Sequence, residues 1–200
     1  MRPRMIVVAG PPGSGKSAIF PVHSFELEYF NADDRSAQLN GGSYQGISLE
    51  TRLIVNREFE QFVENHIRRG ISFAIETTLR SEITLRQMDQ ARVQGFELHM
   101  VFVALSDFSR NLKRVIDRAR AGGHSAPAEQ LRRIHQASLA NLPRAIHEVD
   151  DLNVYDNTAP GGPIELVLSA RNGKVTFRQS PCPGWLREAL DQSEYSVTGE

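Results

Sequence analysis

Short apolar runs alternate along the chain with longer stretches in which apolar residues recur every three or four positions. This alternation predicts an α/β protein built on a parallel sheet. The runs at 5–9 and 98–105 are apolar at successive positions, as in strands buried on both faces, so we expect helices on both faces of the sheet. The five predicted strands are 5–9, 28–30, 72–76, 98–105 and 152–155.

Helical periodicity predicts the segments that connect these strands. Gly70 and Gly95 follow two of these segments, at the position where a left-handed residue commonly ends a helix. Pro143 lies inside the last segment and is expected to kink or end it. The predicted helical ranges are 46–69, 82–94, 107–120 and 127–148.

The pattern changes after the fifth strand. Two extended runs, 164–169 and 174–177, flank the turn signal Arg171-Asn172-Gly173 and predict a β-hairpin appended to the sheet. We therefore expect one domain rather than two. This domain is expected to span 1–200, with a core over about 5–158 and a hairpin and tail over 159–200.

Composition narrows the class of protein. The formal net charge of −1 argues against a protein that coats nucleic acid, so nucleic acid is not an expected partner. No apolar run approaches the roughly 18 residues of a membrane span. The five apolar residues before Gly10 are too few for a signal peptide, and the single cysteine, Cys182, excludes an internal disulfide. A cytoplasmic protein without membrane contact is expected.

The most informative motif follows the first strand. Residues Gly10-Pro11-Pro12-Gly13-Ser14-Gly15-Lys16-Ser17 match G-x-x-x-x-G-K-[ST], a phosphate-binding loop (P-loop). Its glycines let successive N–H groups point at phosphate oxygens. Lys16 is expected to reach the β- and γ-phosphates, and the Ser17 hydroxyl to bind Mg²⁺. The alternative is a glycine turn that Lys-Ser happens to follow. Pro21 predicts that the loop's own helix is very short or bent.

Acidic residues close two of the predicted strands, where ligands of parallel α/β sheets bind. Asp33 could accept the proton of an acceptor hydroxyl, or it could cap the next helix, and Asp34 could do either. Glu76 could bind Mg²⁺ in the second shell or contact an acceptor hydroxyl, or it could be a capping carboxylate. Thr77 and Thr78 follow it directly.

Arginines are concentrated around Gly122-Gly123-His124 on two predicted helices. Guanidinium groups match phosphate oxygens and offset transition-state charge, so this region, about 118–133, is predicted to be a lid over a triphosphate. The alternative is a solvated helix face. The arginines concerned are Arg114, Arg118, Arg120, Arg132 and Arg133.

Taken in order, these motifs resemble the zeta-toxin family of P-loop kinases. The resemblance covers residues 5 to about 158. It implies a P-loop NTPase fold with a nucleotide-kinase-like sheet of order 2-3-1-4-5, ATP or another nucleoside triphosphate, and Mg²⁺. It also implies the 3′-hydroxyl of the sugar in UDP-N-acetylglucosamine as the phosphoryl acceptor, and an antitoxin as a possible partner. The matching blocks are 9–17, Asn31-Ala32-Asp33, Glu76-Thr77-Thr78-Leu79, Gly122-Gly123-His124 and Tyr155-Asp156-Asn157.

The resemblance also assigns roles to residues. Asp33 matches the catalytic base, and Lys16 and Ser17 match the phosphate and metal contacts. Glu76 matches the substrate-binding acid. Asn31, Thr77 and Thr78, which belong to the matching blocks, are assigned to substrate binding with it. The lid arginines match Arg118 and one of Arg132 or Arg133, with Arg132 assigned here, and Asn157 matches a position near the adenine.

Three functions are compatible with the sequence. The leading hypothesis is a small-molecule kinase in which Asp33 deprotonates a hydroxyl. A nucleotide-dependent switch with slow hydrolysis is the second, although the chain lacks the Asn-Lys-x-Asp motif that reads guanine. A polynucleotide-end kinase is the third, and the near-zero charge weighs against it.

Overall fold

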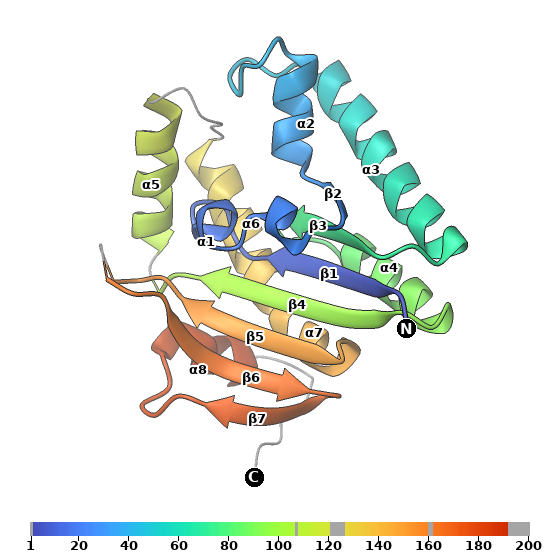
Figure 1. The fold of residues 1–200 in the computed structure, drawn as a ribbon. Coiled ribbons are helices and arrows are strands. Elements are labelled where there is room, and N and C mark those ends of the chain that lie inside the picture. Colours follow the sequence, from blue (N-terminus) through green and yellow to red (C-terminus); the bar gives the residue numbers. More distant parts are fainter. Residues whose placement is uncertain (1, 107, 121–126, 160–161, 192–200) are drawn as a thin grey trace.

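The computed structural model describes residues 2–106, 108–120, 127–159 and 162–191, with the side chains of 118–120 excepted. Within them one seven-stranded sheet has the order β2-β3-β1-β4-β5-β6-β7 (Figure 1). The first five strands are parallel and confirm the predicted order 2-3-1-4-5. The strands are β1 Arg4–Ala9, β2 Glu28–Phe30, β3 Phe73–Thr77, β4 Glu97–Ala104, β5 Asp151–Asp156, β6 Glu165–Arg171 and β7 Lys174–Arg178.

The predicted hairpin is confirmed, and it belongs to the main sheet. β6 pairs antiparallel with β5 and β7 pairs antiparallel with β6. Asn172 and Gly173 connect them with φ values of 49° and 76°. Two consecutive residues with positive φ match the right-handed twist of the flanking strands. The hairpin therefore extends the parallel sheet at its far edge.

The helices follow the predicted pattern with two differences. The long segment predicted over 127–148 is two helices, because Pro143 sits in the first turn of α7, where its missing N–H leaves no bond unmade. α2 and α8 were not predicted. The helical elements are α1 Lys16–Ile19, the 3₁₀ helix η1 Val22–Phe25, α2 Ala32–Leu39, α3 Leu49–Arg69, α4 Glu82–Val93, α5 Phe108–Arg120, α6 Ala128–Ala140, α7 Leu142–Glu148 and α8 Gly184–Asp191.

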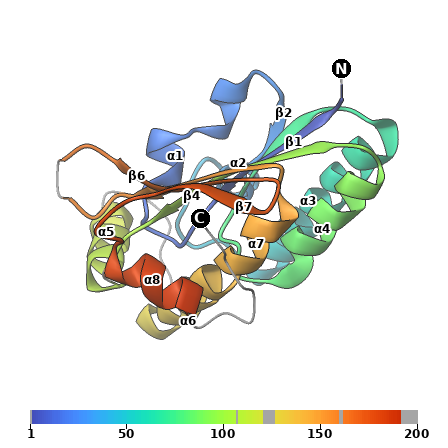
Figure 2. The same ribbon diagram turned by 90° about the horizontal axis from the view of Figure 1, so that it is seen from below.

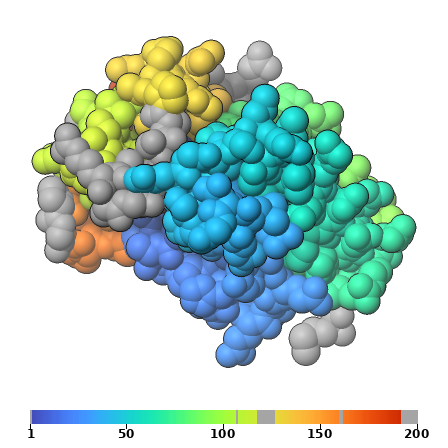
Figure 3. Space-filling view, turned by 90° about the horizontal axis from the view of Figure 1, so that it is seen from above, coloured from blue at the N-terminus to red at the C-terminus, as the bar shows by residue number. Residues whose placement is uncertain are grey.

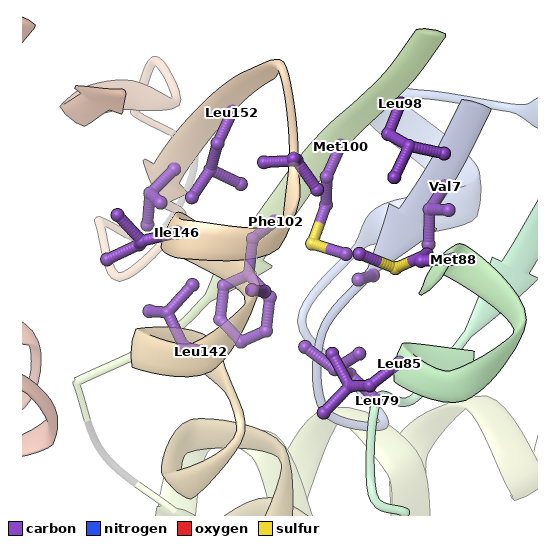
Figure 4. Close-up of a cluster of buried hydrophobic side chains, with 14 of the residues drawn as sticks. Val7, Leu79, Leu85, Met88, Leu98, Met100, Phe102, Leu142, Ile146 and Leu152 are labelled. Atoms are coloured by element: carbon purple, nitrogen blue, oxygen red, sulfur yellow. The ribbon is translucent and has the colours of Figure 1, made fainter. Parts of the chain in front are cut away.

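Helices lie on both faces of the sheet, but unequally. α3, α4, α7 and α8 cover one face, while α1 and η1 lie on the other (Figure 2). The larger core joins side chains of β1, β3 and β4 to α3, α4, α7 and α8, with Phe102 against Leu142 and Ile146 (Figure 4). The smaller core is built around Ile6 and Val8 under Val22 of η1.

The carboxyl ends of the parallel strands meet at one end of the molecule. The arrowheads of these strands point to the left in Figure 1. In the view from above, α2 and α3 face the viewer, and α5 and α6 lie to the left (Figure 3). Among the described residues, no helix has the length and apolar character needed to cross a membrane. The fold thus gathers the P-loop, the strand-end acids and the arginine-bearing helices at this end.

Candidate active site

The P-loop connects β1 to α1 through backbone conformations that need glycine. Gly10 has φ +135°, and a Cβ there would stand 2.0 Å from the Val103 carbonyl oxygen of β4. Gly15 has φ +94°, and a Cβ there would stand 2.6 Å from Nδ2 of Asn157. A side chain at Gly10 would collide with the backbone of β4, and one at Gly15 would meet the end of the Asn157 side chain in a backbone conformation that favours glycine, so the loop geometry depends on both glycines.

α1 is a single turn that begins with Lys16, the lysine of the P-loop motif. It ends before Pro21, which confirms the prediction of a very short helix. The Lys16 side chain is only 7% exposed, and its Nζ donates to the Pro11 carbonyl at 3.3 Å. Nζ also lies 3.9 Å from Oε1 of Glu76. The lysine charge is thus held at the inner side of the loop, where a phosphate would sit.

Glu76, at the end of β3, links the P-loop to the neighbouring strand. Its Oε1 accepts a hydrogen bond from Ser17 Oγ at 2.9 Å, and its Oε2 accepts one from Asn31 Nδ2 at 3.3 Å. Burial raises the pKa of Glu76. The charge of Lys16 and the hydrogen bond from Ser17 oppose this shift, whereas the nearby charges of Asp33 and Asp34 add to it. Glu76 is therefore a bonded, partly desolvated acid and not a helix cap.

The start of α2 separates the roles of Asn31, Asp33 and Asp34. Asn31 is the N-cap, since its Oδ1 accepts from the backbone N–H groups of Asp33 at 2.9 Å and Asp34 at 3.3 Å. Asp34 accepts a hydrogen bond from the Tyr44 hydroxyl at 2.9 Å. Asp33 lines the cavity described below. Because Asn31 caps the helix, the Asp33 carboxylate is not required for capping.

Thr77 ends β3 and Thr78 follows it; both line the cavity described below, but they differ in their other contacts. Thr77 Oγ1 accepts from the Leu79 N–H at 3.2 Å and lies 3.3 Å from Thr84 Oγ1, so its hydroxyl is used within the loop. Leu79 is fully buried with φ +53°, a left-handed conformation that is rare for leucine. Thr78 and Arg80, on either side of it, line the cavity.

These groups surround a cavity of about 670 Å³. Beyond the predicted residues, α3 contributes a polar stripe that sequence reasoning missed. Its members are four residues apart, a spacing that predicts a shared helix face but not what that face contacts. The additional lining residues with polar side chains include Arg52, Asn56 and Glu60 of α3, together with Arg80 and Ser81.

The arginines of the predicted lid do not share one environment. Arg114 of α5 lines the cavity, and its Nη2 donates to the Asn157 carbonyl at 3.1 Å. Arg132 of α6 is exposed, and its guanidinium lies 4.5 Å from the centre of the Phe108 ring. The Arg118 side chain and the Gly122-Gly123-His124 turn lie outside the described residues. The structure thus brings Arg114, and not Arg132, to the cavity.

Asn157 follows β5 and contacts the P-loop directly. Its Nδ2 donates to the Ser14 carbonyl at 2.8 Å. The predicted contact of Asn157 with adenine stays a prediction. The contact with the loop was not predicted, because 143 positions separate the two residues.

A Mg²⁺ ion is compatible with the groups present. Among the described residues no cluster of three or more histidine, cysteine, aspartate or glutamate side chains could form a protein-only metal site. The Ser17 hydroxyl beside the Glu76 carboxylate supplies hard oxygen ligands. Mg²⁺ in such sites keeps several waters and binds one or two protein oxygens plus substrate phosphates.

The parallel sheet, the loop after β1 and the strand-end acids define a P-loop protein with the architecture of nucleotide kinases. A family model described as an AAA domain matches residues 5–139. This match covers more than half of the chain, and the protein belongs to that family.

Comparisons with individual proteins agree with this assignment. A Haemophilus influenzae protein, described as uncharacterized, is 24% identical over 125 residues, which are 62% of this chain and 86% of the relative. The AvrRxo1-ORF1:-ORF2 structure with ATP superposes with a TM-score of 0.71 at 18% identity, covering 100% of this chain and 66% of that chain. The PezAT toxin-antitoxin structure of Streptococcus pneumoniae gives a TM-score of 0.60 at 16% identity, covering 98% and 80%.

At these identities the structural likeness concerns the fold. It confirms the resemblance to zeta-toxin-like P-loop kinases at that level. The chain spans just under two thirds of the length of the AvrRxo1 chain that it matches.

Proposed function

We propose that this protein is an ATP- and Mg²⁺-dependent kinase that phosphorylates a hydroxyl of a small molecule, with a sugar nucleotide such as UDP-N-acetylglucosamine as the acceptor. One observation carries the proposal. Lys16 and Ser17 of the P-loop share a single cavity with Asp33 and Glu76, at the carboxyl ends of the strands. Phosphoryl transfer needs this combination of a phosphate cradle, a cation and a carboxylate near the acceptor.

The nucleotide half of the reaction is assigned to the P-loop. The backbone N–H groups of the loop, which Pro11 and Pro12 lack, bind phosphate oxygens, and Lys16 offsets charge on the β- and γ-phosphates. Ser17 would hold Mg²⁺, with Glu76 beside it, and the bound ion would supply charge neutralisation at the phosphates. Lys16 needs little rearrangement to act, because its side chain is already buried against the loop.

The acceptor half is assigned to the ends of β2 and β3. Asp33 takes the proton of the acceptor hydroxyl as that oxygen bonds to the γ-phosphorus, while the bond from phosphorus to the β,γ-bridging oxygen breaks and ADP leaves. Asn31, Glu76 and Thr78 orient the acceptor. Thr77 acts on it through the loop conformation, since its hydroxyl is bonded to the Leu79 N–H.

The arginines complete the charge balance. Arg118 and Arg132 offset the charge that develops on the transferring group, which requires Arg132 to leave the Phe108 ring. Arg114 already lines the cavity and joins them in this role. We also propose that Asn157 lies near the adenine of the bound nucleotide.

The setting of the activity belongs to the same proposal. The PezAT structure is of a toxin-antitoxin system, and the AvrRxo1 structure contains two components. By analogy, an antitoxin-type protein is proposed as a partner of this chain in the cytoplasm. The neutral net charge supports a small-molecule acceptor over a polynucleotide.

The test is an ATP-consumption screen with Mg²⁺ over sugar nucleotides, nucleosides and dinucleotide cofactors, with products identified by mass. Asp33→Asn is expected to abolish transfer and to leave ATP binding nearly intact. Asp34→Asn is the matched control, because Asp34 neighbours the base and bonds to Tyr44. Transfer at the wild-type rate in Asp33→Asn would refute the assigned base. ATP binding without any phosphorylated acceptor would favour the nucleotide-dependent switch.

A further inference from the structure

The turn that follows β5 is a junction between three parts of the molecule. Asn157 is anchored to the sheet, since its N–H donates to the Ala104 carbonyl at 2.9 Å. From that position its Nδ2 donates to the Ser14 carbonyl of the P-loop. The Asn157 side chain leaves no room for a side chain at Gly15, because its Nδ2 is 2.6 Å from the point where a Cβ on Gly15 would stand. Asn157 therefore fixes the P-loop from behind.

Asp156 ties the same turn to the C-terminal segment. Its Oδ2 accepts a hydrogen bond from the indole Nε1 of Trp185 at 2.7 Å, and its Oδ1 accepts from the Thr158 N–H at 2.7 Å. Trp185 is 6% exposed and belongs to the main hydrophobic core through α8. The Asp156 carboxylate thus links α8 to the backbone of Thr158, two residues further along the chain.

Arginines of α5 complete the junction. Arg110 Nη1 donates to the Thr158 carbonyl at 2.7 Å, and Arg114 Nη2 donates to the Asn157 carbonyl. The two arginines are one helical turn apart, so both reach the same turn. A displacement of Asp156 or Asn157 would therefore be felt by the P-loop and by α5 together.

We propose that Asp156 and Asn157 are positioning residues that couple the C-terminal module, β6, β7 and α8, to the geometry of the phosphate-binding loop. Asn157 holds the loop through the Ser14 carbonyl, and Asp156 holds Asn157 in place by anchoring the turn to Trp185. The module thereby contributes to nucleotide affinity although it supplies no residue to the cavity lining. This inference rests on the ATP binding assumed in the proposed function, and not on the identity of the acceptor.

The chain offers its own reporter for this coupling. Trp185 is the single tryptophan of the sequence, and its indole N–H is the group bonded to Asp156. Binding of MgATP at the loop is expected to change the emission of Trp185 through the turn. A residue that only stabilises the fold would not produce such a signal.

The experiment measures MgATP affinity by calorimetry and Trp185 emission during the same titration, in the full chain. Asn157→Asp removes the donor to Ser14 and is expected to weaken binding by about tenfold or more. Asn153→Asp is the control, because it makes the same change on β5 at a side chain that bonds to Ser169. Asp156→Asn is expected to abolish the emission change, and Trp185→Phe to weaken binding by about three- to tenfold.

The outcomes separate this inference from the proposed function. If the wild type binds MgATP and the Asn157→Asp and Asn153→Asp variants bind it with equal affinity, the coupling alone is overturned. An unaltered emission change in Asp156→Asn would have the same consequence. No binding of MgATP by the wild type would overturn the coupling and the kinase proposal together. Circular dichroism on each variant shows that a loss of affinity is not a loss of fold.

Discussion

The phosphate-binding half of the site and its arginine half differ in how much of their geometry the protein itself holds in place. In the first half, Lys16 is buried, and Ser17 and Asn31 are both hydrogen-bonded to Glu76. In the second, Arg132 is exposed and its guanidinium lies over Phe108, away from the cavity lining. Among the arginines of α5 and α6 whose side chains the structure describes, Arg114 lines the cavity and the others do not.

This difference distinguishes groups suited to binding from groups suited to a later step of the reaction. A cradle of backbone N–H groups and a buried lysine is ready for phosphate without reorganisation, which favours binding. Arginines that pack elsewhere can act only after they move, so they are suited to a step that follows binding. The first half should therefore tolerate substitution poorly, and the second should lose rate more than affinity.

The largest effect is expected at Lys16. Lys16→Met keeps the length of the side chain and removes its charge, so kcat/KM is expected to fall by about 10³-fold. Lys174→Met, on the exposed edge strand β7, is the control and should retain activity. Steady-state kinetics on the acceptor found in the screen measures both. A Lys16→Met enzyme within tenfold of the wild type would contradict the assignment of this half.

The next effect concerns the backbone of the P-loop. Gly10→Ala places a Cβ 2.0 Å from the Val103 oxygen, so the free energy of unfolding is expected to fall by about 3 kcal/mol or more. Gly41→Ala is the comparison, because Gly41 also has positive φ, +65°, but has open space around it. Strain alone should cost about 1–2 kcal/mol there. Urea unfolding of both variants would show equal losses if the contact with β4 were unimportant.

A smaller effect is expected for the exposed arginine. Arg132→Ala should lower kcat by about tenfold and change ATP affinity little, because its proposed role begins only in the transition state. Loss of the contact with Phe108 should lower the free energy of unfolding by only about 0.5–1 kcal/mol. Arg133→Ala is the matched comparison one position along α6. A larger loss of kcat at Arg133 would transfer the lid assignment to that residue.

The smallest effect is a pH dependence of stability that arises at Glu76. Burial raises the pKa of this carboxyl in the folded protein above its unfolded value of about 4.3. Between the unfolded and the folded pKa, the folded state binds more protons than the unfolded state, so the free energy of unfolding falls as pH rises through this window, by less than about 1.4 kcal/mol per pH unit. Glu76→Gln should flatten the slope. Urea unfolding measured from pH 4 to pH 7, as a rough range, would contradict this if both proteins gave the same slope.

Much of the fold follows from local patterns. The parallel strands and the hairpin were predicted from these patterns, and Gly70 ends α3 in the left-handed conformation expected of it. The strand order was predicted only from the resemblance to a known family. α2 was missed because it is short and polar, and it forms where the Asn31 cap and packing against α3 support it. α8 was missed for a related reason, since eight residues carry little periodicity and Trp185 packs only once the sheet is complete.

The candidate site likewise contains residues that the sequence predicted and residues that it did not. The P-loop could be predicted from eight consecutive residues, because its motif is complete within one short segment of the chain. The α3 stripe of Arg52, Asn56 and Glu60 could not be placed, because helical spacing shows that residues share a face and not what that face meets. The chemistry of Thr77 was also hidden, since its hydroxyl bonds to a loop that depends on the left-handed Leu79.

The sequence by itself determined the phosphate-binding loop, the alternation of strands and helices and the acids at the strand ends, because these depend on residues close together in the chain. Only the tertiary structure decided that Ser17 bonds to Glu76, 59 positions away, and Ser14 to Asn157, 143 positions away. Such contacts depend on the register of strands and the packing of helices on the sheet. No local pattern encodes those, since they result from the burial of the whole core at once.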